Sequence, residues 1–142
     1  MSNKITINTG FKTYDLVNEK DELLGQISFN PSDVNITQRY KKVVDDLEKM
    51  DVGEKPSNEA DDLIESIRKV DEIIYEKINY LTNADIAATL FSIMGPFSPM
   101  PTGQYFVEYI MEMIGNIITQ ETGARVKKMS EHIQKHTKKY HG

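Results

Sequence analysis

Cysteine is absent from the 142 residues of this chain. Without thiols the protein forms no disulfides, carries no cysteine nucleophile and offers no cysteine ligands to zinc, which fits a reducing compartment. A single domain of this length buries roughly two-thirds of the surface of its unfolded chain. We therefore expect it to fold without support from metals or disulfides.

The sequence also lacks the patterns of exported and membrane proteins. Its first residues, MSNKITINTG, do not show the charged-then-apolar order of a signal peptide. The most apolar stretch is interrupted by prolines and by Glu108 and Glu112, so it is not a membrane span. We predict a soluble cytosolic protein that does not contact a membrane.

Sequence motifs of catalysis are missing as well. No GxxxxGK[ST], GxGxxG or GxSxG pattern occurs, and residues 15–26 lack the central glycine of an EF-hand loop. His132 and His136 share one helical face, but HIQKH lacks the glutamate that follows the first histidine in zinc hydrolases. Glu108 and Glu112 are explained by the exposed face of an amphipathic helix. We predict no enzyme, no cofactor and no metal site.

Charge is distributed unevenly along the chain. The formal net charge is -5, yet residues 125–142 hold six basic residues and one acidic residue, a balance of +5 that leaves -10 for the rest. The cations are Arg125, Lys127, Lys128, Lys135, Lys138 and Lys139. We predict that this basic tail mediates electrostatic self-association and that the protein is a homo-oligomer. The alternative is a small helical nucleic-acid-binding or regulatory protein that uses the tail, with Tyr140 as a stacking residue, although the acidic body argues against it.

The first 30 residues predict a β-hairpin. Residues 12–17 favour extended structure, residues 18–21 form a polar turn, and Leu23, Ile27 and Phe29 alternate on a second strand. Two strands alone are marginal in water. The hairpin must therefore lie on the helices, pair with residues 5–7, or pair with another copy of the chain.

Apolar residues at helical spacing predict helices over most of the remaining chain. One stripe is Ile36, Tyr40, Val43, Leu47 and Met50, and after a linker at residues 51–58 a second is Leu63, Ile67, Val70, Ile74, Ile78 and Leu81. A third helix is expected at about residues 84–94, capped by Thr82 or Asn83 and ended by a left-handed Gly95.

The last predicted helix begins near Gly103 with Thr102 as its cap and passes Gly115 and Gly123. Each glycine costs of order 1 kcal/mol in a helix interior, so we expect a bend or break near Gly123. The predicted fold is mainly α, a bundle of about four helices preceded by an N-terminal β-hairpin. We assign one domain with three regions: the hairpin region 1–30, the helical body 31–124 and the basic tail 125–142.

Residues 95–103, GPFSPMPTG, form the most distinctive stretch, which we call the elbow. Its prolines restrict the backbone and lower the entropy cost of presenting side chains to a partner. Flat rings and flexible thioethers surround it, a composition suited to binding apolar helices. The predicted partner-binding residues are Phe91, Met94, Phe97, Met100, Tyr105, Phe106, Tyr109 and Met113. The alternative is that most of them form the core of the bundle.

These features together resemble a known family. The hairpin TYDLVNEKDELLGQISFNPSD, the segment FSIMGPFSPMPTGQYFVEYIMEMI and the ending HTKKYHG resemble the tail assembly chaperones of long-tailed phages and prophages of Gram-positive bacteria. The matching motifs are Gly95-Pro96, Tyr105-Phe106 and Lys138-Lys139-Tyr140. The resemblance covers most of the chain.

The resemblance implies a non-enzymatic helper in the cytoplasm of the bacterial host. Members of that family coat the long, hydrophobic tape measure protein, present it for tail tube polymerisation, and then leave. The implied partners are therefore the tape measure protein and the tail tube protein. A longer product made by ribosomal frameshifting is common in the family.

Overall fold

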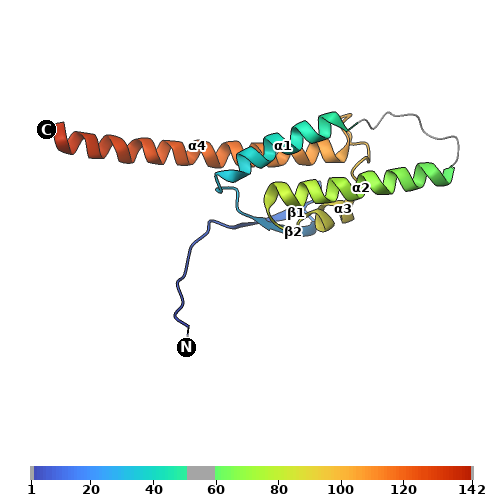
Figure 1. The fold of residues 1–142 in the computed structure, drawn as a ribbon, viewed down its shortest axis with the longest axis horizontal. Coiled ribbons are helices and arrows are strands. Elements are labelled where there is room, and N and C mark those ends of the chain that lie inside the picture. Colours follow the sequence, from blue (N-terminus) through green and yellow to red (C-terminus); the bar gives the residue numbers. More distant parts are fainter. Residues whose placement is uncertain (1, 51–59, 142) are drawn as a thin grey trace.

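A computed structural model describes the backbone of residues 2–50 and 60–141 and the side chains of residues 2–50 and 68–123. Within these ranges the elements are β1 (Lys12–Val17), β2 (Leu23–Phe29), α1 (Asn35–Lys49), α2 (Ala60–Thr82), α3 (Ala87–Ile93) and α4 (Phe106–His141) (Figure 1). The mainly α fold with an N-terminal hairpin is confirmed. The predicted linker at residues 51–58 lies outside the described residues.

The hairpin pairs β1 and β2 antiparallel, with Lys12 opposite Phe29. Its turn is held by the Asn18 side chain, whose Oδ1 accepts hydrogen bonds from the amides of Lys20 and Glu22 at 2.9 and 3.0 Å. Ile27 and Phe29 on the inner face of β2 are buried. Of the three placements left open for the hairpin, the structure shows the first, because this face lies on the helices.

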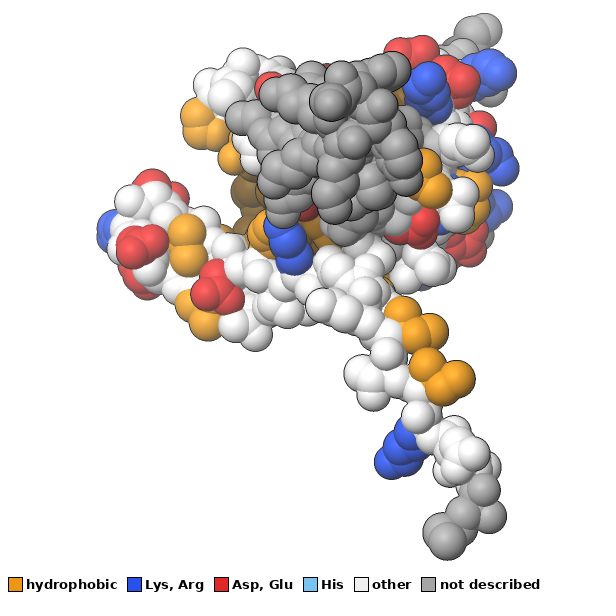
Figure 2. Space-filling model, turned by 90° about the vertical axis from the view of Figure 1, so that its left-hand side faces the viewer, with side chains coloured by type: hydrophobic (Ala, Val, Ile, Leu, Met, Phe, Trp, Pro, Cys, Tyr) orange, Lys and Arg blue, Asp and Glu red, His pale blue; other side chains and the backbone are white. Residues whose placement is uncertain are grey.

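The N-terminal arm, residues 2–9, leaves the body without pairing to either strand. Ile5 and Ile7 are 87% and 75% exposed. Figure 2 shows hydrophobic side chains along this arm. The Asn30 side chain holds the base of the arm by donating to the carbonyl of Thr9.

A single hydrophobic core draws residues from β2 and from all four described helices. The buried positions of the two predicted stripes are Ile36 and Val43 on α1, and Ile74, Ile78 and Leu81 on α2. Leu63 and Ile67 lie outside the described side chains. On α4 the buried residues Ile110, Ile114 and Ile118 recur every four positions, as expected for one face of a helix.

The junction between α2 and α3 corrects the predicted capping. Neither Thr82 nor Asn83 caps α3; instead Asn79 Oδ1 accepts hydrogen bonds from the amides of Ile86 and Ala87, both at 2.9 Å. The helix is shorter than expected: it ends at Ile93, and the next residue, Met94, is extended. The left-handed conformation predicted for Gly95 is also wrong, since the described glycines with positive φ are Gly10 and Gly103.

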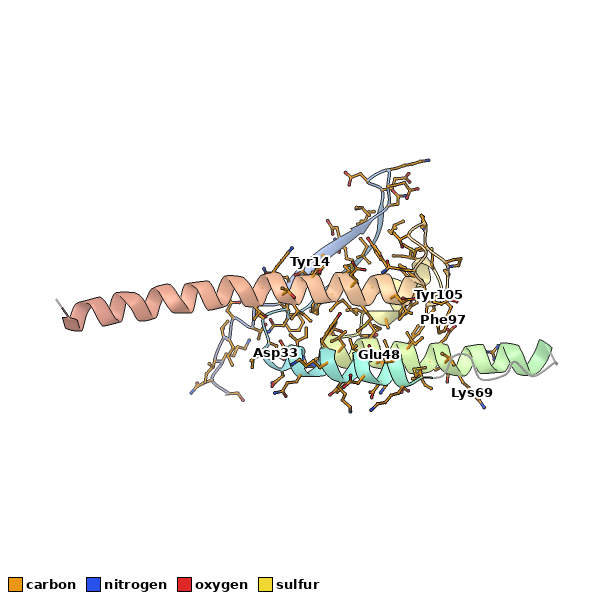
Figure 3. All side chains as sticks on the ribbon, turned by 90° about the horizontal axis from the view of Figure 1, so that it is seen from above. Tyr14, Asp33, Glu48, Lys69, Phe97 and Tyr105 are labelled. Atoms are coloured by element: carbon orange, nitrogen blue, oxygen red, sulfur yellow. The ribbon has the colours of Figure 1, made fainter. Side chains whose placement is uncertain are left out.

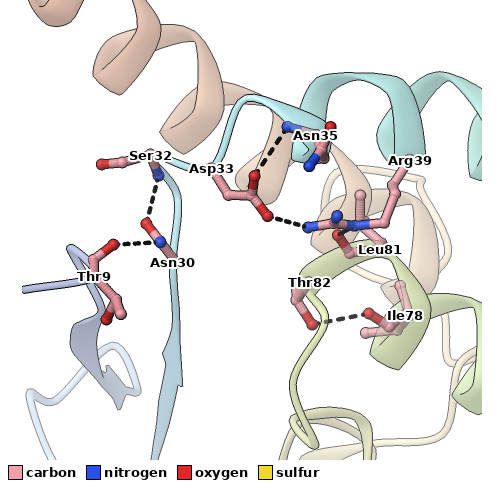
Figure 4. A network of polar contacts seen from close by, with 9 residues as sticks. All are labelled: Thr9, Asn30, Ser32, Asp33, Asn35, Arg39, Ile78, Leu81 and Thr82. Atoms are coloured by element: carbon pink, nitrogen blue, oxygen red, sulfur yellow. Dashed lines mark hydrogen bonds and ion pairs between the residues drawn. The ribbon is translucent and has the colours of Figure 1, made fainter. Parts of the chain in front are cut away.

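Asp33 joins the start of α1 to the end of α2 (Figure 4). Its Oδ1 accepts the amide of Asn35 at 3.0 Å, and its Oδ2 accepts from Arg39 Nη2 at 3.2 Å. Arg39 Nε donates in turn to the carbonyl of Leu81 at 3.0 Å. The amide of Asn35, and after it Arg39, lower the pKa of Asp33 below its ordinary value. The ionised carboxylate therefore stabilises this junction.

The predicted break near Gly123 is wrong, because α4 runs without interruption from Phe106 to His141. The second half of α4 extends beyond the body of the protein (Figure 1). Gly115 has a packing role: a Cβ there would lie 2.6 Å from Tyr40 Oη. A Cβ at Gly123 would meet no atom within 4 Å. The basic tail is thus the end of a straight helix rather than a separate segment.

Candidate partner-binding groove

The elbow caps the first turn of α4 with its own carbonyls. The amide of Phe106 donates to the carbonyl of Ser98 at 2.9 Å, and the amide of Val107 donates to that of Pro96 at 2.8 Å. A helix start otherwise leaves these amides unpaired. The elbow is therefore hydrogen-bonded to the first turn of α4.

Thr102 does not cap α4 as predicted; its hydroxyl lies 3.4 Å from the amide of Gln104 within the same loop. Glu108 takes the capping role, because its Oε1 accepts the amide of Tyr105 at 3.2 Å. This is one half of a capping box, in which the third helical residue reaches back to the residue before the helix.

Phe97 and Tyr105 meet edge to face beside the start of α4. Their ring centroids are 5.8 Å apart at an interplanar angle of 82°, a geometry that aromatic pairs favour. Tyr105 is 50% exposed and Phe97 is half-buried. Figure 3 shows both side chains at the end of α4 from which the elbow emerges.

This aromatic pair forms part of a groove between α1 and the first turns of α4. The groove has a volume of about 800 Å³. Its apolar lining comes from three parts of the chain: Tyr40, Val44, Leu47 and Met50 on or next to α1, Ile74 on α2, and Phe97, Tyr105, Val107 and Met111 around the start of α4. Gln104 and three glutamates complete the lining.

The charge along the groove is of one sign. Glu48 on α1 and Glu108 and Glu112 on α4 are exposed, and no Lys or Arg occurs among the described residues that line the groove. Glu48 is labelled on α1 in Figure 3. An apolar floor with acidic edges suits an amphipathic helix that carries cations beside its apolar stripe.

Tyr40 holds the floor of the groove in place. Its hydroxyl donates to the carbonyl of Met111 at 2.9 Å and thereby ties α1 to α4. Burial, and after it the charge of Glu112, raise the pKa of Tyr40 above its ordinary value. The hydroxyl consequently stays protonated and able to donate across the neutral pH range.

The structure separates the eight predicted partner-binding residues into two groups. Phe91 and Phe106 are buried with ring centroids 6.0 Å apart, and Tyr75 lies 5.0 Å from Phe91. The prediction that Phe91 and Phe106 contact a partner is wrong. Both rings belong to the core, because α2 and α4 pack over α3. Of the other six, only Phe97 and Tyr105 line the groove.

The remaining four predicted residues do not line the groove. Met94, Met100 and Met113 are half-buried against the core, and Tyr109 is 42% exposed. The six tail cations, Arg125, Lys127, Lys128, Lys135, Lys138 and Lys139, lie outside the described side chains, and so do His132 and His136. In the part of the chain whose side chains are described, no group of three metal-ligating residues occurs.

Sequence reasoning missed the contribution of α1 to the groove. The sequence pattern places Tyr40 and Leu47 on the apolar stripe of a predicted amphipathic helix without assigning them to a binding surface, and it does not single out Val44. The available signal was that α1 carries more apolar residues than a single buried face needs. Only Ile36 and Val43 are fully buried on this helix.

No protein-family model, curated protein or solved structure matches this chain. Among the described residues, no helix combines the length and apolar character needed to cross a membrane.

Proposed function

We propose that this protein is a non-enzymatic assembly chaperone that binds apolar helical segments of a long client in the groove between α1 and α4. The resemblance to phage tail assembly chaperones makes the client a tape measure protein, presented for assembly of a tail tube in the cytoplasm of a bacterial host. The single observation that carries the proposal is the apolar groove bordered by Phe97 and Tyr105.

The volume of the groove is that of a ligand-binding pocket. Its volume of about 800 Å³ lies within the range of about 300–1,000 Å³ that encloses a drug-sized molecule. A helix laid in such a groove inserts the side chains of one stripe, spaced three or four residues apart. Leu47, Met50 and Met111 add flexible side chains that adapt to stripes of varied shape.

The acidic exterior supports a role as a soluble cover for an apolar client. Outside the tail the chain carries a net charge of -10. Copies bound along one client would repel one another's bodies and other acidic proteins, which keeps the complex from aggregating. The elbow, fastened to α4, supplies a preorganised edge to the groove and lowers the entropy cost of binding.

The test is co-expression with the tape measure protein encoded in the same gene cluster, followed by purification and light scattering. We expect the client to become soluble only with this chain present and to carry many copies of it. A client that stays insoluble while this chain elutes alone would refute the proposal.

Two tyrosines provide a matched pair of variants. Tyr105 lines the groove and Tyr109 does not, although both are exposed near the start of α4. Tyr105→Ala should weaken client binding about tenfold or more, as for aromatic residues at the centre of interfaces, whereas Tyr109→Ala should leave it near wild type. Binding of purified chain to a synthetic client helix, followed by fluorescence anisotropy, measures both. Equal effects of the two variants would place the client elsewhere.

A further inference from the structure

The N-terminal arm has the sequence of a β-strand. In residues 4–9, KITINT, isoleucine alternates with polar residues, which is the pattern of a strand with one apolar side. Ile5 and Ile7 therefore share one side of the arm, and the polar residues share the other. Both isoleucines are exposed, and no backbone hydrogen bond joins the arm to another part of the described chain. The arm is thus an unpaired strand with an uncovered apolar side.

The fold directs the arm away from the hairpin of its own chain. Asn30, directly after β2, donates its side-chain amide to the carbonyl of Thr9 (Figure 4). The arm therefore continues past the end of β2, and Figure 1 shows it leading away from the body. In this position the arm can pair only with a strand of another molecule.

The outer edge of β1 is open to a further strand. Among the described residues, no backbone hydrogen bond joins residues 13–17 to any element other than β2. Exposed edge strands are usually protected by lysine, proline or a bulge. Residues 13–17 contain neither lysine nor proline, and the bulge of this hairpin lies on β2, where Leu24 is the extra residue. The edge of β1 is therefore regular and unprotected.

We propose that the arm of one copy adds as an antiparallel strand to the edge of β1 in a second copy. In one register Ile5 lies opposite Leu16 and Ile7 lies opposite Tyr14. Tyr14 and Leu16 pack against the core on the inner side of the hairpin and are half-buried. Cross-strand pairs of apolar and aromatic residues stabilise a sheet. The isoleucines would therefore extend its apolar side.

The same register matches the polar side of the arm to the outer side of the hairpin. Thr6 falls opposite Asp15, and Asn8 falls opposite Thr13. Lys4 lies diagonally from Asp15, at a distance that a long side chain spans, so their opposite charges can meet. A shift by one residue would turn both isoleucines to the outer side. Apolar and polar residues thus specify one pairing together.

Every copy carries one arm and one open edge. Two copies that exchange arms form a closed dimer, whereas arms passed on in one direction form a ring or an open chain. In strand additions of this kind the main-chain hydrogen bonds give affinity and the alternate side chains give specificity. The contact uses neither the groove nor the basic tail, so it does not depend on the proposed function.

Disulfide cross-linking tests the pairing, because the natural chain has no cysteine. A Thr6→Cys chain is mixed with an Asp15→Cys chain under mild oxidation, and each dimer is identified by its mass. Opposed residues of antiparallel strands have Cα atoms about 4.5–5.5 Å apart, which a disulfide spans. The mixed dimer should form about tenfold faster, or more, than either homodimer.

The matched control uses Gln26→Cys in place of Asp15→Cys. Gln26 pairs with Asp15 and is exposed on the same side of the sheet, but it lies one strand further from the arm. With strands about 4.8 Å apart, its Cα would be about 10 Å from that of Thr6, beyond the reach of a disulfide. This mixture should cross-link at least about tenfold more slowly.

Removing the apolar side of the arm provides a second measurement. Ile5→Ser with Ile7→Ser should lower the self-association constant about tenfold or more, measured by light scattering over a concentration series. Both residues lie outside the core, so circular dichroism should show native helix content. The control, Val34→Ser with Ile73→Ser, removes two exposed apolar side chains outside the arm and the hairpin and should associate like wild type.

Four outcomes would each overturn the inference. They are a wild-type chain that stays monomeric, an unchanged association constant without the two isoleucines, a predominance of Thr6→Cys homodimers, and a reaction with Gln26→Cys as fast as with Asp15→Cys. Thr6→Cys homodimers would indicate that arms pair with each other, and fast reaction with Gln26→Cys would indicate an arm on the edge of β2. No client enters these measurements, so their failure is distinct from failure of the proposed function.

Discussion

Gly115→Ala tests whether the contact between α1 and α4 depends on the absence of a side chain in α4. A Cβ at this position would lie 2.6 Å from Tyr40 Oη and 3.0 Å from Tyr40 Cζ. The Tyr40 ring would have to move, and its hydrogen bond to the carbonyl of Met111 would be lost. That carbonyl can still accept the helical amide four residues later, so the substitution leaves no orphan acceptor there.

Three contributions set the expected change in the free energy of unfolding. Replacing glycine by alanine within a helix gains about 1 kcal/mol, and losing a neutral hydrogen bond costs about 1 kcal/mol. These two terms offset each other, so the overpacking against Tyr40, about 1–3 kcal/mol, decides the sign. We expect Gly115→Ala to lower the free energy of unfolding by about 1–3 kcal/mol.

Urea unfolding followed by far-UV circular dichroism, at one protein concentration throughout, measures this difference. Gly123→Ala is the matched control in the same helix, because a Cβ there meets no atom within 4 Å. It should stabilise by about 1 kcal/mol. In a Tyr40→Ala background the clash is absent and Gly115→Ala should become stabilising too. Stabilisation by Gly115→Ala in the wild-type background would refute the packing argument.

Two further substitutions test the junctions between helices. Asn79→Ala should lower the free energy of unfolding by about 1–2 kcal/mol, because the amides of Ile86 and Ala87 lose their acceptor. Asn83→Gly, which removes the side chain expected to cap and keeps the positive φ of this residue free of strain, should cost less in the same urea assay. Asp33→Asn should cost about 1 kcal/mol at neutral pH. Because the folded-state pKa of Asp33 is lowered, its contribution is present above the ordinary value of 3.8 and is lost as the pH falls through the folded-state pKa. The gap in stability between wild type and Asp33→Asn should therefore close on acidification below about pH 4, and a gap unchanged by pH would contradict this assignment.

The groove illustrates why a binding surface is harder to predict than the elements that form it. Tyr40 and Met111 meet although they are far apart in the sequence, and their contact depends on which faces of α1 and α4 approach each other. Hydrophobic periodicity indicates that each helix has an apolar face. It does not specify the neighbouring helix or where two faces diverge to leave a groove.

Capping was mispredicted for a related reason. Sequence rules look for a cap immediately before the helix, as with Thr82 for α3 and Thr102 for α4. In the structure, Asn79 reaches α3 from the preceding helix, and the carbonyls of Pro96 and Ser98 serve α4. Such acceptors satisfy the same orphan amides through the folded chain.

Local signals were sufficient to predict the hairpin, the stripes of α1 and α2, and the contrast between an acidic body and a basic tail. They arise from the period of two in strands, the period of about 3.6 in helices, and the count of charged residues. Only the tertiary structure decided that Phe91 and Phe106 are core while Phe97 borders a groove, since three identical side chains differ only in what packs against them. It also decided that α4 continues past Gly123. A local cost of about 1 kcal/mol did not break the helix there, and the continuous helix carries the basic tail away from the groove of its own chain.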